Sequence, residues 1–269
     1  MSHFLSAIFI CFFFGIFLLL YATVIEPYSL DITRYNVHNP HIPNLKIVFV
    51  SDLHIGPSRF EEHRFNHIVE KINQENADLI FLGGDYVKGH QRQSSAPIQK
   101  IVEKLSTLKN KYGIFAVLGN HDNYYGKQEV LDAFSHSNII VLDNQNVTIP
   151  VYDLNITIAG VSDLSTDKPD IDKALSDATS PTILLSHSPD LFPDIKTIDL
   201  MLAGHTHGGQ IVIPFVGAPL VASNYGQRYR YGFIREPQKN MIVSKGLGTS
   251  LLPLRFNCRP EIVVIQFTP

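Results

Sequence analysis

Five short polar segments, each placed directly after an apolar run, constrain this sequence more than any other feature. Each run has the length and composition of a buried strand, and each ends in Gly or Ser before an Asp, Asn or His appears. The segments are VSDLH at 50–54, LGGDYV at 82–87, LGNHD at 118–122, LSHSPD at 185–190 and AGHTHGG at 203–209. Ligands of α/β sheets bind in the crevice beyond the carboxyl ends of the strands. We therefore expect the five segments to converge on one site.

The polar residues of these segments are of the kind that binds divalent metal ions. The candidate ligands are Asp52, His54, Asp85, Asn120, His187, His205 and His207. Carboxylate, amide oxygen and imidazole suit Mn, Fe or Zn, and the absence of cysteine from the five segments argues against a structural zinc site. Seven ligands are too many for one ion that must keep an open position. Two ions about 3.5–4 Å apart that share a carboxylate and a water would use them all, and such a pair favours phosphoryl chemistry.

Each of these residues also has an ordinary structural explanation. An Asp at a strand end is more often a turn or helix-cap residue, and a lone histidine such as His187 is more often a hydrogen-bonded core residue. The pairs Asp52 with His54 and His205 with His207 are harder to explain in that way, because two residues of one loop can reach the same site. The joint occurrence of all five segments favours the metal site.

The pattern of apolar runs predicts the fold class. From residue 45 onward, β-rich runs alternate with amphipathic stretches, and helices are expected near 60–75, 97–109 and 127–136. Expected strands include KIVFVS, DLIFLGG, IFAVLG, 139–142, 147–161, TILLS and 199–204. The later segments 210–214, 230–234, 240–244 and 261–267 read as short strands without helices between them, which favours a mixed sheet. We expect one two-sheet α/β domain over 45–269.

The N-terminal part has a different character. No charged residue occurs from Phe4 to Ile25, and this run is long enough to cross a hydrocarbon layer of about 30 Å. We expect a transmembrane anchor over 1–25 and a connector over 26–44, whose three prolines suit an extended chain with one short edge strand. A cleaved secretory signal is the alternative, although the run is longer than a usual signal core and no Lys or Arg precedes it. The expected location is a bacterial inner membrane, crossed once, with the side of the domain left open.

Composition excludes several classes of protein. A net charge of −3 and a pI of about 6.4 provide no overall basic field, so binding of duplex nucleic acid is not expected. The two cysteines, Cys11 and Cys258, cannot form a disulfide framework, since the first lies in the apolar run. Neither the G-x-S-x-G motif of serine hydrolases nor a P-loop is present.

The order D-x-H, G-D, G-N-H-D, H and G-H-x-H resembles the signature of the calcineurin-like metallophosphoesterase superfamily. The segments SHSPD, DLMLAGHTHGGQIVIPFVGAP and LPLRFNCRPEIVVI are similar to its membrane-associated bacterial branch, the phosphodiesterases of the YaeI and YkuE type. This resemblance covers nearly the whole chain after the apolar run. It implies a four-layer α/β/β/α sandwich that follows an N-terminal transmembrane helix.

The resemblance also implies a role for each residue of the site. One metal ion would be held by Asp52, His54, Asp85 and His207, and the other by Asp85, Asn120, His187 and His205. His121 would not bind metal but would lie over the scissile phosphate, as the proton donor to the leaving oxygen or as a stabiliser of charge. Asp122 would not bind metal itself but would hydrogen-bond to the ligand residues and orient them. The two divalent ions would be Mn, Fe or Zn, with Mn expected to support activity in vitro.

Three functions are compatible with this site. The first is a phosphodiesterase, or phosphoric ester hydrolase, in which a metal-bridging hydroxide is the nucleophile. The second is a pyrophosphohydrolase at the membrane surface that acts on a lipid-linked nucleotide such as UDP-2,3-diacylglucosamine, for which the apolar segment 211–226 would be the lid or groove. The third is a metal-binding scaffold without catalysis. Four arginines, Arg228, Arg230, Arg255 and Arg259, either bind substrate phosphates or lie on the surface.

Overall fold

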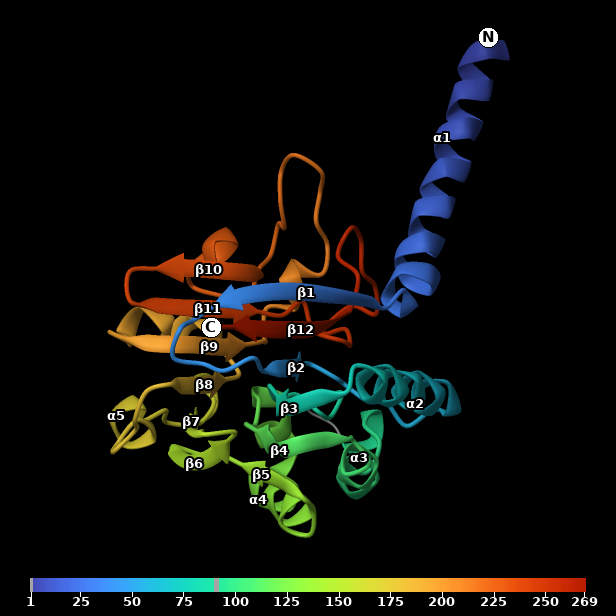
Figure 1. Ribbon diagram of the computed structural model, residues 1–269. Coiled ribbons are helices and arrows are strands. Elements are labelled where there is room, and N and C mark those ends of the chain that lie inside the picture. The colour runs from blue at the N-terminus through green and yellow to red at the C-terminus, as the bar shows by residue number, and fades with distance from the viewer. Residues whose placement is uncertain (1, 90–91) are drawn as a thin grey trace.

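Two six-stranded sheets lie face to face in the computed structural model, which describes residues 2–89 and 92–269 (Figure 1). The first sheet has, in spatial order, β1 (Asp31–His38), β12 (Glu261–Thr268), β2 (Lys46–Val50), β3 (Ala77–Leu82), β4 (Asn110–Ala116) and β5 (Ile139–Val141). The second has β10 (Gly232–Glu236), β11 (Lys239–Val243), β9 (Ile198–Ala203), β8 (Thr182–Ser186), β7 (Leu154–Gly160) and β6 (Gln145–Val151). The two-sheet α/β fold predicted from the sequence is confirmed.

Strand β2 is apolar at consecutive positions because both of its faces are buried. Ile47 and Phe49 pack in the core between the two sheets, whereas Val48 and Val50 pack against the helices outside the first sheet. A strand that is covered on both faces loses the alternation of polar and apolar residues. The central strands of both sheets run parallel, and the antiparallel pairs β12/β2, β6/β7 and β10/β11 make both sheets mixed.

Three helices cover the outer face of the first sheet (Figure 1). They are α2 (Arg59–Gln74), α3 (Ile98–Leu105) and α4 (Asn120–Ser135). The outer face of the second sheet carries only short helices, namely α5 (Ile171–Ala174) and 3-10 turns at Pro189–Asp194 and Gly226–Tyr229. The expected fourth layer is therefore present but thin.

The structure corrects the sequence-based boundaries at three places. Helix α4 begins at Asn120 instead of near 127, with a break at Gly126, where φ is 141°. The expected strand 147–161 is the hairpin of β6 and β7. The segment 210–214 is no strand, because the chain turns out of the sheet through left-handed conformations at Gly208, Gly209 and Gln210 and keeps only isolated bridges, Ile211 to Phe256 and Ile213 to Gly217.

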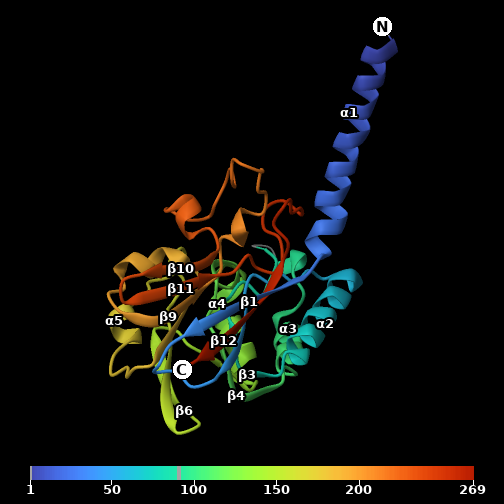
Figure 2. The same ribbon diagram turned by 45° about the horizontal axis from the view of Figure 1, so that its top comes forward.

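Helix α1 (Ser2–Leu20) stands outside the body of the molecule (Figures 1 and 2). It continues through a π-helical turn at Tyr21–Ile25 and a 3-10 turn at Glu26–Tyr28. By length and composition, Phe4–Tyr28 could cross a membrane or serve as a signal sequence. The following residues form β1, which pairs in parallel with β12 over eight residues at the edge of the first sheet. The connector thus includes an edge strand that belongs to the sheet.

Candidate metal centre

The structure brings all seven candidate ligands together at one edge of the two sheets. They follow β2, β3, β8 and β9, except for Asn120, which is the first residue of α4. Asn120 and His205 are half-buried and border a cavity, whereas the other five are buried. Because these strands are parallel neighbours within their sheets, their carboxyl ends meet at the same edge.

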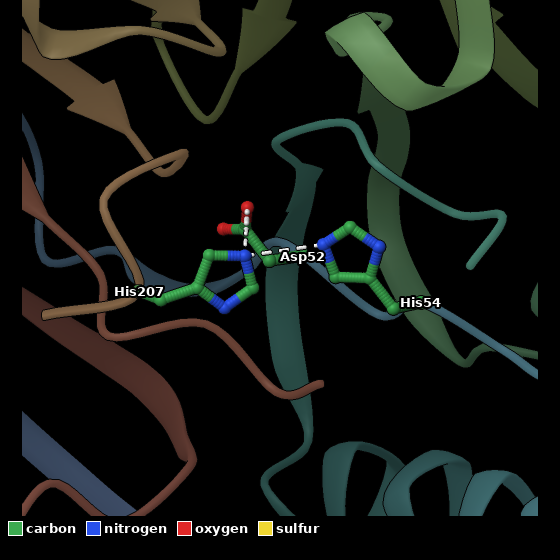
Figure 3. Close-up of side chains that lie close together, drawn as sticks. All are labelled: Asp52, His54 and His207. Atoms are coloured by element: carbon green, nitrogen blue, oxygen red, sulfur yellow. Dashed lines mark hydrogen bonds and ion pairs between the residues drawn. The ribbon is translucent and has the colours of Figure 1, made fainter. Parts of the chain in front are cut away.

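One group of side chains surrounds the imidazole of His207 (Figure 3). Its Nε2 lies 3.4 Å from Oδ1 of Asp52 and 3.1 Å from Nε2 of His54. Nε2 of His54 in turn lies 3.5 Å from Oδ2 of Asp85. The group Asp52, His54 and His207 could hold a metal ion, since its ligand atoms lie within 4.8 Å of one another.

A second group surrounds the imidazole of His187. Its Nε2 lies 3.3 Å from Oδ2 of Asp85, 3.2 Å from Oδ1 of Asn120 and 3.1 Å from Nδ1 of His205. Oδ2 of Asp85 is therefore the atom that both groups share.

The spacing and the tautomers of these groups fit metal ions. Ligand atoms about 2.1 Å from one ion lie about 3.0–3.4 Å apart in octahedral or tetrahedral geometry, close to the 3.1–3.5 Å seen here. Nδ1 of His54 donates to the carbonyl oxygen of Val87, and Nδ1 of His187 donates to that of Gly83. In the neutral ring this leaves Nε2 without a proton and aimed at the group, as a metal ligand requires.

Backbone amides hold the carboxylates of the site in place. Oδ1 of Asp85 accepts from the amide of His121, and both oxygens of Asp52 accept from the amide of His205. The buried carboxylate of Asp122 accepts from the amides of Asp85, Tyr86 and Gly119 at 2.8–2.9 Å. Asp122 thus ties the loop after β3 to the start of α4.

Backbone strain is concentrated in the same loops. Five of the seven residues have left-handed backbone conformations, with φ between 45° and 69°: Asp52, His54, Asp85, His205 and His207. A residue with a side chain adopts this region at a cost of about 1–3 kcal/mol, and such residues persist where the surroundings over-determine them, often at functional sites. The backbone of Gly119 also lies so close to Asp85 that a Cβ at this position would collide with the carboxylate.

Burial and mutual charge shift the pKa values of the cluster in opposite directions. Burial raises the pKa of Asp52 to about 6 and lowers those of His54 to about 3 and His205 to about 4. Although burial alone would lower it, the pKa of His187 lies well above its usual value because Asp85 is adjacent. Burial alone would raise the pKa of Asp85, but the charges of His187 and His54 hold it well below its usual range. A proton on His187 thus offsets the buried negative charge of Asp85, and a bound metal ion could offset the same charge.

The sequence interpretation missed Asp163 and misjudged Arg255. Asp163 follows β7 in the same way as Asp52 follows β2, and it is buried within the electrostatic reach of His187 and His205. Its Ser-Asp context after an apolar run was a signal that could have identified it. Arg255 was expected to bind phosphate or lie on the surface, but it is fully buried. Its guanidinium donates to the carbonyl oxygens of Lys245, Gly246, Gly248 and Cys258, and it lies 3.5 Å from Nδ1 of His207.

A cavity of about 240 Å³ opens beside the two groups. Its polar floor is lined by Asp85, Asn120, His121, His205 and His207. His121 is 9% exposed, and its ring packs edge-on against that of His54, with centroids 4.6 Å apart. The rest of the lining, which we call the wall, is largely apolar and includes Ile211, Pro219, Leu220, Ala222, Leu251 and Leu252. The cavity therefore joins candidate metal ligands and an imidazole to an apolar surface.

Comparison with known proteins gives a consistent result. Residues 45–209 match the model of a family described as calcineurin-like phosphoesterase. The chain is 34% identical over 236 residues to an uncharacterized metallophosphoesterase of Helicobacter pylori (strain ATCC 700392 / 26695), a match that covers 84% of this chain but 60% of the relative. It is 33% identical over 256 residues to the metallophosphoesterase YkuE of Bacillus subtilis, covering 91% and 87%. It is 33% identical over 227 residues to the phosphodiesterase YaeI of Escherichia coli, covering 82% and 81%.

Proposed function

The chain belongs to the calcineurin-like phosphoesterase family, and from this premise we propose that it is a metal-dependent hydrolase of phosphodiesters. The observation that carries the proposal is the position of Asp85, whose Oδ2 lies 3.5 Å from His54 and 3.3 Å from His187. One carboxylate oxygen shared by two ligand groups is what a pair of metal ions needs.

The ligand assignment follows from the two groups. We assign one ion to Asp52, His54, Asp85 and His207, and the other to Asp85, Asn120, His187 and His205. When bound, a pair of divalent ions lowers the pKa of a water between them and neutralises charge on the phosphoryl oxygens. The residues support Mn, Fe or Zn, since they combine imidazole with carboxylate and amide oxygens.

His121 is the proposed proton donor. Its amide donates to Asp85, which fixes the start of α4 against the cluster, and its side chain lines the cavity next to Asn120. A histidine at this place can give a proton to the leaving oxygen of an ester whose phosphate lies over the cluster. Asp122 acts through Asp85, because its carboxylate holds the backbone that presents this residue.

The apolar wall bears on the choice between substrates. A diester has a second substituent on its phosphate, and the cavity offers room for it between the metal-binding floor and the apolar residues. The same wall favours the second candidate, a pyrophosphohydrolase of a lipid-linked nucleotide, over a scaffold without catalysis. We place the enzyme at a bacterial inner membrane, anchored by α1, since Phe4–Tyr28 is long and apolar enough to cross it.

The full chain, purified in detergent and loaded with Mn, tests the proposal. The assay substrates are bis-p-nitrophenyl phosphate, p-nitrophenyl phosphate and UDP-2,3-diacylglucosamine. We expect turnover of the diester that is lost in Asn120→Ala and kept in Asn155→Ala, a control on the exposed side of β7. Release of UMP from the lipid substrate would promote the second candidate. Metal-loaded protein that hydrolyses none of the three would refute the enzymatic proposal.

A further inference from the structure

Two uncharged segments carry the most exposed large apolar side chains of the described catalytic body. The segment 211–222 presents Phe215, Val216 and Leu220, which are 110%, 73% and 80% exposed, and the segment 249–254 presents Leu251, which is 98% exposed. No charged residue occurs in either segment. Contiguous exposed apolar surface of this kind marks a contact with another molecule or with a membrane. We call the two segments together the rim.

The rim surrounds the mouth of the metal centre. Ile211, Pro219, Leu220 and Ala222 line the cavity from one segment, and Ser250, Leu251 and Leu252 line it from the other. The side chain of Gln210 joins the two segments, since its Nε2 donates to the carbonyl oxygens of Leu252 and Leu254 and its Oε1 accepts from the amide of Ser250. The rim is therefore a connected structure and not two independent loops.

The rim lies on the same side of the body as α1. In Figure 1 the segment 211–222 (orange) and the segment 249–254 (red) both rise toward the side from which α1 extends, and the orange segment reaches the level of the lower turns of this helix. The rotated view in Figure 2 shows the same relation. A membrane crossed by α1 would therefore meet the rim before any other part of the body.

The orientation of α1 relative to the rim is fixed by hydrogen bonds. The carboxylate of Glu26, buried directly after the helix, accepts from the amides of Asn257 and Cys258, and the carbonyl oxygen of Ala22 accepts from the amide of Arg255 at 2.9 Å. The segment 255–258 directly follows the rim segment 249–254. The base of the helix is thus tied to the rim without a flexible linker.

The backbone of the rim supports a role outside the folded chain. Phe215 and Leu251 have φ values of 67° and 60°, in the left-handed region that bulky residues avoid. Neither side chain gains burial within the chain in return. A glycine or asparagine would fit both places with less strain, so the presence of Phe and Leu indicates a benefit that comes from contact with something else.

We propose that the rim rests in the surface of the lipid bilayer that α1 crosses, so that the metal centre opens onto the membrane and takes phosphoesters whose apolar tails lie in it. The contact rests on the membrane anchoring proposed above, and the choice of substrate rests on the proposed hydrolase. Apolar and aromatic side chains without nearby charge are what a bilayer interface accepts. The segments flank the cavity, so a tail could pass between them while its phosphate reaches the floor.

The absence of tryptophan from the sequence allows a direct test. The full-length variants Phe215→Trp and Leu251→Trp each carry a single tryptophan, which is excited selectively over the tyrosines. They are reconstituted into vesicles of phosphatidylethanolamine and phosphatidylglycerol, with or without brominated acyl chains. We expect blue-shifted emission and strong quenching by the brominated lipid at both positions. Tyr152→Trp is the matched control, because Tyr152 is also exposed but lies in the β6–β7 turn, away from α1.

The fluorescence does not depend on catalysis, so it separates this inference from the proposed function. Emission at 215 and 251 that matches the control, with equal access to acrylamide, would overturn the membrane contact. Should Phe215→Trp fail to fold by circular dichroism, Val216→Trp tests the same segment.

The substrate part has its own readout. Turnover of a phosphodiester lipid in vesicles is compared with turnover of bis-p-nitrophenyl phosphate by the same preparation. We expect Phe215→Asp to lower the ratio of the two rates by about tenfold, the loss that corresponds to one apolar contact with the membrane. An unchanged ratio, or a protein that hydrolyses only the soluble ester, would overturn the lipid substrate while leaving the hydrolase proposal intact.

Discussion

The floor of the cavity and its rim are built in opposite ways. The floor consists of buried charged and polar side chains, such as Asp52 and His187, that hydrogen bonds and neighbouring charges hold in place. The rim consists of exposed apolar side chains, such as Phe215 and Leu251, without comparable packing. Both regions contain residues in left-handed conformations. In the floor the surrounding fold offsets the strain, whereas in the rim the described structure contains no such compensation. A site can therefore be recognised both by buried charge and by exposed apolar surface.

The largest effect is expected in the floor, for Asp85→Asn. An amide cannot supply the charged oxygen that two metal ions would share, so turnover of bis-p-nitrophenyl phosphate should fall by about 10³-fold or more. Metal bound per chain, measured by mass spectrometry of the elements, should fall with it. The control is Asp153→Asn in the exposed β6–β7 turn. Full activity of Asp85→Asn would remove the basis for a shared carboxylate.

A smaller loss of activity is expected for Asp122→Asn, because Asp122 contacts the backbone of the floor residue Asp85. The carboxylate accepts from four backbone amides, and an asparagine would place an NH₂ group against at least one of them. We expect metal affinity and activity to fall about 10- to 100-fold and stability to fall by about 1–3 kcal/mol. Urea unfolding and metal titration of one preparation measure both. A variant that loses stability but keeps metal affinity would limit Asp122 to a structural role.

The pH dependence of metal binding sharpens the description of the floor. The pKa of His187 is raised, so this side chain must release a proton to bind metal near neutrality. Below about pH 6 the carboxyl of Asp52 must release a second proton. His54 and His205 are already neutral above about pH 4. Protons therefore compete with the metal, and affinity should fall as pH falls, by about tenfold per pH unit near neutrality and more steeply below about pH 6. Mn titration by electron paramagnetic resonance measures this. Affinity that does not change with pH would contradict the charge arrangement.

The smallest effect is expected at the rim, for Leu251→Asn. The side chain is 98% exposed, so its removal costs no burial, and asparagine adopts a left-handed backbone more readily. We expect the protein in detergent to gain up to about 1 kcal/mol in the free energy of unfolding. Leu252→Asn, next in the chain and also exposed, has an ordinary φ and should change stability by less than about 0.5 kcal/mol. A large loss for Leu251→Asn would mean that the rim packs like a core.

The fold was predictable where apolar runs are buried by the chain itself. It was mispredicted at the segment 210–214 and at the start of α4. Strands such as β2, β3 and β8 follow directly from their sequences. The segment 210–214 was read as a strand because it is apolar, but an apolar run does not specify what covers it, and this one leads into an exposed loop. The start of α4 was missed because its first turns contain a candidate metal ligand and a capping residue in place of an apolar face.

The residues alone determined which side chains gather, because parallel strands bring their carboxyl ends to one edge and the polar segments sit at those ends. Only the tertiary structure decided how they are arranged. Distances such as that from Asp85 to His187, the carbonyl partners of the imidazoles and the burial of Arg255 depend on loops far apart in sequence. The relation of the rim to α1 also depends on the hydrogen bonds between Glu26 and the segment 255–258. Local sequence specifies strands and turns, whereas contacts between distant loops form only when the two sheets pack.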